Sequence, residues 1–145
     1  MPISVPDGQE RFLDKLMKRV TGIGGIFFKA KNPKELNAWY ERHLGLKPSA
    51  DAGGSVIFKW RDEDDPDKDG VTVWALFPAD TEYFNPGKAS FMINYRVDNL
   101  DAVLEALKAE GVTIDPKRED YDYGRFAWIM DPEGNRIELW EPAKK

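Results

Sequence analysis

The apolar residues of this chain recur with two periods, which alternate in the same order twice. Runs rich in β-branched and aromatic residues predict strands. Between them, apolar residues from Leu36 to Leu44, and again from Leu100 to Leu107, fall at helical spacing. The predicted strands are Ile23–Lys31, Ser55–Arg61, Val71–Pro78, Phe91–Val97, Val112–Ile114, Phe126–Met130 and Arg136–Trp140.

Capping residues set the bounds of both predicted helices. Asn32 is a good N-cap, Glu35 three residues later completes a capping box, and Gly45 is the expected stop. Asn99 and Gly111 bound the second helix in the same way, and the two cap-to-stop distances are 13 and 12 residues. The agreement in spacing indicates a repeated structural unit.

The repeat predicts one α+β domain over residues 1–145, in which two β-α-β-β-β modules form curved mixed sheets around a cleft. The predicted parts are an N-terminal helical extension (1–21), module one (22–82) and module two (88–142). Within the extension, an apolar stripe from Phe12 to Val20 predicts an amphipathic helix over residues 9–20. We expect this helix to pack outside the repeat, where it suits contact with a second copy of the chain.

Three stretches carry more specific motifs. Ala38–Leu46 combines a helix ending in Trp-Tyr with a Leu-Gly-Leu, Tyr95–Leu100 joins a strand to a capped helix, and Asp131–Leu139 forms a closing hairpin. Together they resemble the vicinal oxygen chelate superfamily, which includes glyoxalase I, bleomycin resistance proteins and extradiol dioxygenases. The resemblance covers about residues 22–142. It implies sheets curled into a cleft, a central metal in the metal-dependent members, and frequent dimers.

The metal positions that this resemblance implies lack suitable ligands. In metal-dependent members the ligands lie on the first and last strands of each module, and the corresponding positions here are Gly25, Trp74, Met92 and Glu138. Glycine has no side chain, tryptophan offers only an N–H, and a methionine thioether suits soft metals. Since catalytic zinc takes about three protein ligands, one carboxylate is insufficient, and we expect no metal and no other cofactor.

Strand alternation predicts which side chains line the cleft. One set is almost wholly apolar and is expected to pack under the helices. The other set mixes aromatic and polar residues, as ligand clefts do, and its candidate ligand-binding residues are Phe27, Trp74, Met92, Asn94 and Trp140. Glu138 lies among them and is the candidate general acid or base, because burial favours its protonated form. The alternatives are an ion pair of Glu138 with Arg96 or Lys29, and a groove that holds only water.

These features predict a glyoxalase- or bleomycin resistance-like protein that binds a small, partly apolar or aromatic molecule without the family's metal. The alternative is a lyase, isomerase or dioxygenase of the same superfamily, with Glu138 as a metal ligand or proton-transfer group. A protein-interaction domain is a third alternative. Whether the protein is an enzyme stays open at this point. The expected partners are a small-molecule ligand and a second copy of the chain in a homodimer.

Composition and charge indicate which partners and which cellular location to expect. The chain has 26 acidic and 21 basic residues, a net charge of −5, and its basic residues form no stripe, so neither nucleic acid nor a membrane is an expected partner. No apolar run approaches the ~18 residues of a membrane span. Met1–Glu10 lacks the pattern of a signal peptide, and the chain has no cysteine. We therefore expect a cytoplasmic location.

Three further features are less specific. Asp65–Gly70 matches the first half of a calcium loop, but Leu76 holds the twelfth position, so a solvated acidic loop is favoured. His43 is the single imidazole, and its place on a helix face favours a structural role over metal binding or catalysis. Tyr121 and Tyr123 precede the closing hairpin, either as a lid over the cleft or as an exposed aromatic loop.

Overall fold

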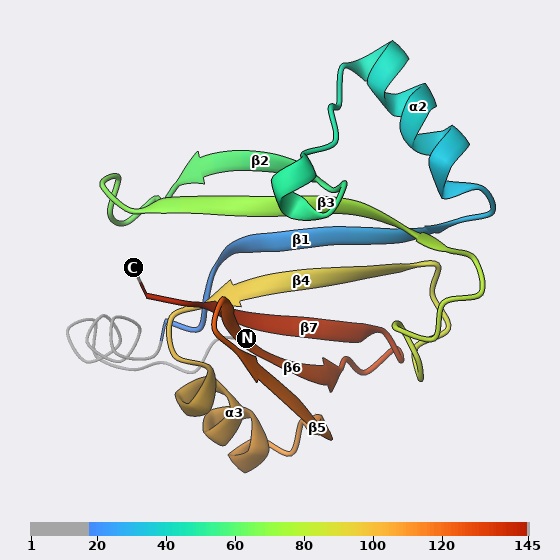
Figure 1. Cartoon of the computed structure of the whole chain (residues 1–145). Coiled ribbons are helices and arrows are strands. Elements are labelled where there is room, and N and C mark those ends of the chain that lie inside the picture. The colour runs from blue at the N-terminus through green and yellow to red at the C-terminus, as the bar shows by residue number, and fades with distance from the viewer. Residues whose placement is uncertain (1–17, 145) are drawn as a thin grey trace, which may run out of the picture.

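The computed structural model describes residues 18–144, which form a seven-stranded mixed sheet with two α-helices (Figure 1). The strand order across the sheet is β2-β3-β1-β4-β7-β6-β5. The elements are β1 (Val20–Ala30), α2 (Pro33–Leu44), η1 (Ala50–Ala52), β2 (Val56–Arg61), β3 (Asp69–Pro78), β4 (Phe91–Val97), α3 (Leu100–Ala109), β5 (Thr113–Tyr121), β6 (Gly124–Met130) and β7 (Arg136–Pro142). The predicted α+β class is confirmed.

The two modules meet at the central pair of strands. β1 and β4 run antiparallel, with Gly25 opposite Asn94 and Phe27 opposite Met92. This symmetric pairing makes Gly25 correspond to Met92, and Phe27 to Asn94, across an approximate twofold axis. The last strand of each module pairs in parallel with its first, β3 with β1 and β7 with β4. The middle of the sheet therefore brings together side chains from both modules.

Module one is a strand shorter than the predicted unit. After α2 the chain forms the short helix η1, and Gly53 and Gly54 follow with φ of 64° and 90°, which turn the backbone instead of extending it. Module two does have the additional strand. β5 pairs antiparallel with β6 at the sheet edge and is longer than the predicted Val112–Ile114.

The helix predicted at residues 9–20 lies mostly outside the described residues. The prediction is wrong for its C-terminal end, because Val20 is the first residue of β1 and lies opposite Val97 of β4. Just before it, the Arg19 guanidinium donates two hydrogen bonds of 2.9 and 2.6 Å to the Glu110 carboxylate. Val20 is therefore paired with β4 in the sheet and is not the end of a helix.

Both predicted N-caps are confirmed. The Asn32 side chain accepts a hydrogen bond from the Glu35 N–H at 3.2 Å, and the Asn99 side chain accepts one from the Ala102 N–H at 3.0 Å. Gly45 ends α2 with a φ of 70°, as a left-handed C-cap does. These caps fix where each module passes from strand to helix.

Both helices lie on one face of the sheet, the outer face. α3 packs closely there, in a buried cluster formed by Val97, Leu100, Val103, Ala127 and Leu139. α2 packs less closely, since all 12 of its residues are at least partly exposed. Its main contact is the Tyr40 ring, which lies 4.8 Å from the Trp74 ring. The opposite, inner face has its own buried cluster, formed by Phe27, Phe84, Met92 and Trp128.

Candidate functional site

The inner face holds a buried carboxylate at its centre. Glu138 is 2% exposed, and three side chains donate hydrogen bonds to it. Asn94 Nδ2 donates to Oε1 at 2.6 Å, Trp128 Nε1 donates to Oε2 at 2.9 Å, and the Tyr83 hydroxyl also donates to Oε2. Each carboxylate oxygen is therefore an acceptor for a neutral donor.

Strand register places three of these four groups. Asn94 of β4 lies opposite Glu138 of β7 in a parallel pair, and Trp128 of β6 lies opposite Glu138 in an antiparallel pair. Residues directly opposite on paired strands share a face, so the three side chains form a row across the sheet. Tyr83 comes from elsewhere, namely the connection between β3 and β4 (residues 79–90).

Burial dominates the electrostatics of this group. It raises the pKa of the Glu138 carboxyl above its ordinary value, while the hydrogen bonds from Tyr83, Asn94 and Trp128 oppose that shift. Burial and the adjacent Glu138 carboxylate also raise the pKa of the Tyr83 hydroxyl, which therefore stays protonated. Tyr83 thus remains a hydrogen-bond donor to the Glu138 carboxyl.

A buried arginine lies beside this group and binds the backbone of the same connection. Arg136, 7% exposed, donates from Nη1 to the Tyr83 carbonyl oxygen at 2.6 Å and from Nη2 to Asp115 Oδ2 at 3.3 Å. Its guanidinium lies 4.8 Å from the centre of the Trp128 ring. Arg136 and Glu138 are two residues apart on β7, so one strand binds both the carbonyl and the hydroxyl of Tyr83.

The connection at 79–90 covers this part of the inner face. Phe84, 1% exposed, fills the space between the sheet side chains, and the Tyr83 ring stacks on Phe77 with centroids 5.5 Å apart and planes 6° apart. At Gly87 the backbone lies so close to the sheet that a Cβ would be 3.0 Å from the Arg136 nitrogen. The centre of the inner face is therefore closed by this connection.

Five of the six predicted site residues lie on the inner face: Phe27, Met92, Asn94, Glu138 and Trp140. The predicted face is wrong for the sixth, Trp74. It lies opposite Ile26 in β1, and its ring contacts Phe28 and Tyr40 under α2. The inner-face residues of β3 are instead Val73, Ala75 and Phe77.

The alternative of an ion pair between Glu138 and Arg96 or Lys29 is also wrong. Arg96 donates to the Asp69 carbonyl oxygen at 3.2 Å, and Lys29 lies over the Phe84 ring at 5.6 Å. Both cations are occupied elsewhere, and Glu138 is held by neutral donors.

Sequence reasoning missed three residues of the site. Strand alternation could have placed Trp128 and Arg136 on the inner face, because each lies at an even spacing from an inner-face residue of its own strand. It could not have placed Tyr83, since Tyr83 lies in an irregular connection 55 residues before Glu138.

The comparisons with known proteins assign the family. A family model described as Glyoxalase/Bleomycin resistance protein/Dioxygenase superfamily matches residues 22–139. The chain belongs to this superfamily. No curated protein sequence matches it.

Solved structures with this glyoxalase fold include a variant of methylmalonyl-CoA epimerase from Streptomyces coelicolor in complex with 2-nitronate-propionyl-CoA. It has a TM-score of 0.61 and 18% identity, covering 86% of this chain and 99% of that one. Methylmalonyl-CoA epimerase from Mycobacterium tuberculosis has a TM-score of 0.51 and 22% identity, covering 86% and 90%. A structure described as NAD-dependent benzaldehyde dehydrogenase from Legionella pneumophila has a TM-score of 0.53 and 16% identity, covering 80% and 96%. At these identities the likeness shows the fold alone.

The side chains of this glyoxalase-superfamily member do not fit the metal of its metal-dependent relatives. By the twofold relation, Glu138 corresponds to Ala75, not to Trp74, since Asn94 is opposite Glu138 and Phe27 is opposite Ala75. Alanine has no metal-binding atom, and the Glu138 oxygens face N–H and O–H donors. Across residues 18–144, no three His, Asp or Glu side chains are grouped so that they could hold a metal ion.

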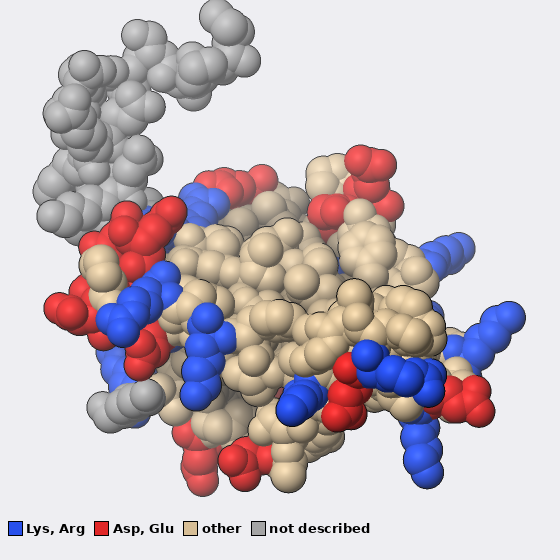
Figure 2. Space-filling model, turned by 90° about the horizontal axis from the view of Figure 1, so that it is seen from above, with Lys and Arg blue, Asp and Glu red and all other residues tan. Residues whose placement is uncertain are grey.

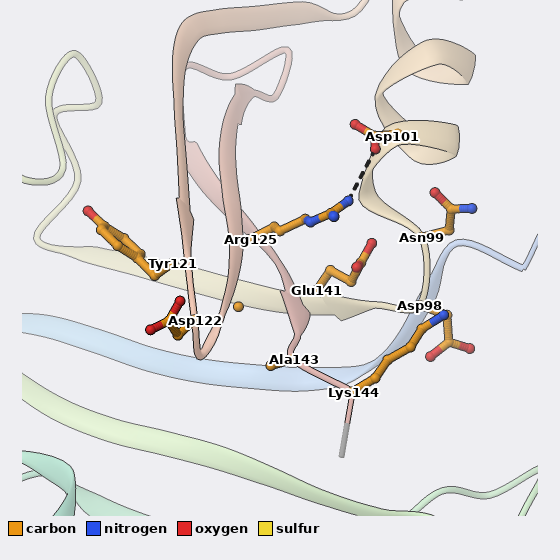
Figure 3. Close-up of a pocket in the computed structure, with 10 residues that line it drawn as sticks. Asp98, Asn99, Asp101, Tyr121, Asp122, Arg125, Glu141, Ala143 and Lys144 are labelled. Atoms are coloured by element: carbon orange, nitrogen blue, oxygen red, sulfur yellow. Dashed lines mark hydrogen bonds and ion pairs between the residues drawn. The ribbon is translucent and has the colours of Figure 1, made fainter.

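Two pockets lie near the C-terminal end of β7. The larger, of about 830 Å³, has Trp140, Arg96 and Val71 in its wall. Trp140 is two residues after Glu138 on β7, so this pocket continues the inner face beyond the covered centre. The second, of about 500 Å³, lies where the β5–β6 turn faces the start of α3 (Figure 3). In this second pocket Arg125 pairs with Asp101 at 3.4 Å.

The remaining sequence features lie away from Glu138. Tyr121 and Tyr123 stack on each other 5.0 Å apart and are 46% and 64% exposed, at the β5–β6 turn. His43 is exposed on α2 beside Trp39, with ring centroids 4.9 Å apart. In the acidic loop, Asp62 accepts hydrogen bonds from backbone N–H groups of its own loop, which turns the carboxylate inward. No helix in the described part of the chain is long and apolar enough to cross a membrane.

Proposed function

We propose that the protein binds a small, partly apolar or aromatic molecule on the inner face, with the Glu138 carboxyl as its polar anchor and without a divalent cation. The observation that carries this proposal is a carboxyl group, 2% exposed, at the centre of a face whose buried apolar side chains are Phe27, Met92 and Trp128. An apolar wall with one polar anchor is the usual composition of a small-molecule site.

The energetics favour a functional role over a structural one. Burying a carboxylate is costly, and neutral donors compensate it less fully than a cation does. Glu138 has no ion-pair partner among the described residues, although Arg136 lies two residues away and binds Tyr83 and Asp115 instead. A group kept buried at such a cost, with a raised pKa, is typical of functional sites.

A proton-transfer enzyme is the second candidate. It is supported by the burial that raises the pKa of Glu138, because a general acid or base works best with a pKa near the working pH. Several solved structures of this fold are described as methylmalonyl-CoA epimerases. If a substrate is turned over, Glu138→Gln should lower the rate by about 10²-fold or more while the substrate still binds.

Nuclear magnetic resonance tests the binding proposal through the Trp128 indole N–H, which donates directly to Glu138. The protein is titrated with three probes: p-cresol, toluene and cyclohexanol. At least one should shift this resonance saturably, and Glu138→Gln should weaken the binding of a probe that carries a hydroxyl by about 2- to 10-fold. Glu133→Gln, in an exposed turn, is the matched control and should leave binding unchanged. If no probe shifts the Trp128 resonance, the proposal is wrong.

We also propose that the protein forms a homodimer through α2 and β2. Seen from above, this side of the molecule has uncharged side chains over its middle and charged ones around its edge (Figure 2). Trp39, Leu44 and Phe58 are 45%, 60% and 43% exposed there, and β2 is an edge strand. Light scattering should give twice the 16.6 kDa chain mass, and Trp39→Glu should reduce the measured mass. A monomer at micromolar concentration contradicts the proposal.

The cytoplasmic location stays a prediction.

A further inference from the structure

The connection at 79–90 is held to the sheet by few residues. Phe84 and Gly87 are its buried residues, Tyr83 is half-buried, and most of the others are exposed. Segments with so few buried contacts open more readily than the strands beneath them. Its hydrogen bonds to the sheet are those of Tyr83 to Glu138, of Arg136 to the Tyr83 carbonyl oxygen, and of the Lys29 N–H to the Ser90 carbonyl oxygen.

The Tyr83 side chain fits a slot whose walls belong to the sheet. Its ring is parallel to Phe77 on β3 and edge-on to Trp128 on β6, with centroids 6.2 Å apart and planes 87° apart. The Arg136 guanidinium lies 6.0 Å from the centre of the ring. At the end of the slot, the hydroxyl donates to Glu138. Strands supply the walls and the anchor, whereas the connection between β3 and β4 supplies the occupant.

We propose that Tyr83 occupies the position of the ligand, and that the ligand itself carries a phenol-like group, a planar ring with a hydroxyl, which displaces Tyr83 from Glu138. This inference rests on the proposed function and specifies its ligand class. The connection at 79–90 then acts as a cover that the ligand replaces.

The chemistry of the slot selects against other groups. A ligand carboxylate or phosphate in the position of the Tyr83 hydroxyl would lie against the Glu138 carboxylate, and two like charges at this distance repel each other. A ring without a hydroxyl would leave the buried Glu138 one donor short, which is unfavourable. A neutral hydroxyl on a flat ring satisfies both the anchor and the walls.

The proposal predicts an unusual effect of a conservative variant. Tyr83→Phe keeps the ring in the slot but removes the hydrogen bond by which the cover competes with the ligand. It should therefore bind p-cresol about 3- to 10-fold more tightly than the wild type, the range expected from one hydrogen bond. A tyrosine with only a structural role would leave binding unchanged or weaken it.

The experiment compares p-cresol with toluene in the wild type, Tyr83→Phe and Tyr123→Phe, with titrations followed at Trp128 and at the backbone amides of residues 79–90. Tyr123 is 64% exposed, so its variant controls for loss of a hydroxyl. We expect p-cresol to bind more tightly than toluene, Tyr83→Phe to bind it more tightly still, and Tyr123→Phe to match the wild type.

The two proposals fail differently. If toluene binds as tightly as p-cresol, or if Tyr83→Phe does not gain affinity, the phenol-like ligand is wrong while a small-molecule site remains. If neither probe nor cyclohexanol binds any variant, the proposed function is wrong, and this inference with it.

Discussion

Substitution of the buried carboxylate should change how stability depends on pH. In Glu138→Gln the side chain keeps its shape and loses its charge. The new amide oxygen can accept from Tyr83 and Trp128, and the new NH₂ group faces Asn94. Asn94 Oδ1 has no hydrogen-bond partner among the described residues, so rotation of the Asn94 amide gives that NH₂ group an acceptor. The variant is therefore expected to fold.

The direction of the pKa shift determines whether Glu138 makes the protein more or less stable as the pH rises. Because burial raises the pKa of Glu138 above the ordinary 4.5, the folded state holds more protons than the unfolded state between these two pKa values. The contribution of Glu138 to the free energy of unfolding is therefore greatest below pH 4.5 and is lost as the pH rises through the folded pKa. The loss approaches at most about 1.4 kcal/mol per pH unit, the value for one proton.

Urea unfolding, followed by tryptophan fluorescence from pH 4.5 to 8, measures this contribution as the difference between wild type and Glu138→Gln. Subtraction cancels other groups, such as Asp115 and Asp131, whose pKa values are lowered by hydrogen bonds to backbone N–H groups and neighbouring side chains. The wild type should lose stability relative to the variant as the pH rises. A stability difference that is independent of pH, or of opposite sign, would show that burial does not raise the pKa of Glu138.

Four further outcomes are expected. Trp74→Ala should lower the free energy of unfolding by about 3–5 kcal/mol in urea titrations, yet leave probe binding unchanged, because Trp74 lies under α2. Gly24→Ala should lower the free energy of unfolding by about 1–3 kcal/mol, since its Cβ would be 2.3 Å from Asn94 Oδ1. An unchanged midpoint of urea unfolding would contradict this. Arg136→Met should speed amide hydrogen exchange over residues 79–90, and equal exchange would show that Arg136 does not hold the cover. Added Zn²⁺ or Mn²⁺ should give no calorimetric binding at Glu138, measured against Glu138→Gln.

The sequence was most informative where polar and apolar residues differ between the two faces of a strand. In β4 and β7, Asn94 and Glu138 mark one face as distinct from its apolar neighbours, so alternation placed both correctly. In β3 both faces are apolar, with Val73 and Ala75 on one side and Trp74 on the other. Alternation therefore does not show which residues of β3 face inward. Only the register with β1 shows it.

The cover over the site could not be predicted for a different reason. Tyr83 and Phe84 lie in an irregular connection, where side-chain direction follows no period. Their positions depend on tertiary contacts, Tyr83 with Glu138 and Phe84 with Phe27 and Met92. The helix caps, by contrast, depend on residues three positions apart, and the sequence contains that information directly.

The most direct test of a metal-free ligand site at Glu138 is a crystal structure of the protein soaked with p-cresol and Mn²⁺, with anomalous data collected for manganese. We predict electron density for an aromatic ring on the inner face, its polar atom at the Glu138 carboxyl, and no anomalous peak within coordination distance of that carboxyl. A manganese ion bound by Glu138 with further protein ligands, or p-cresol bound only away from the inner face, would contradict this prediction.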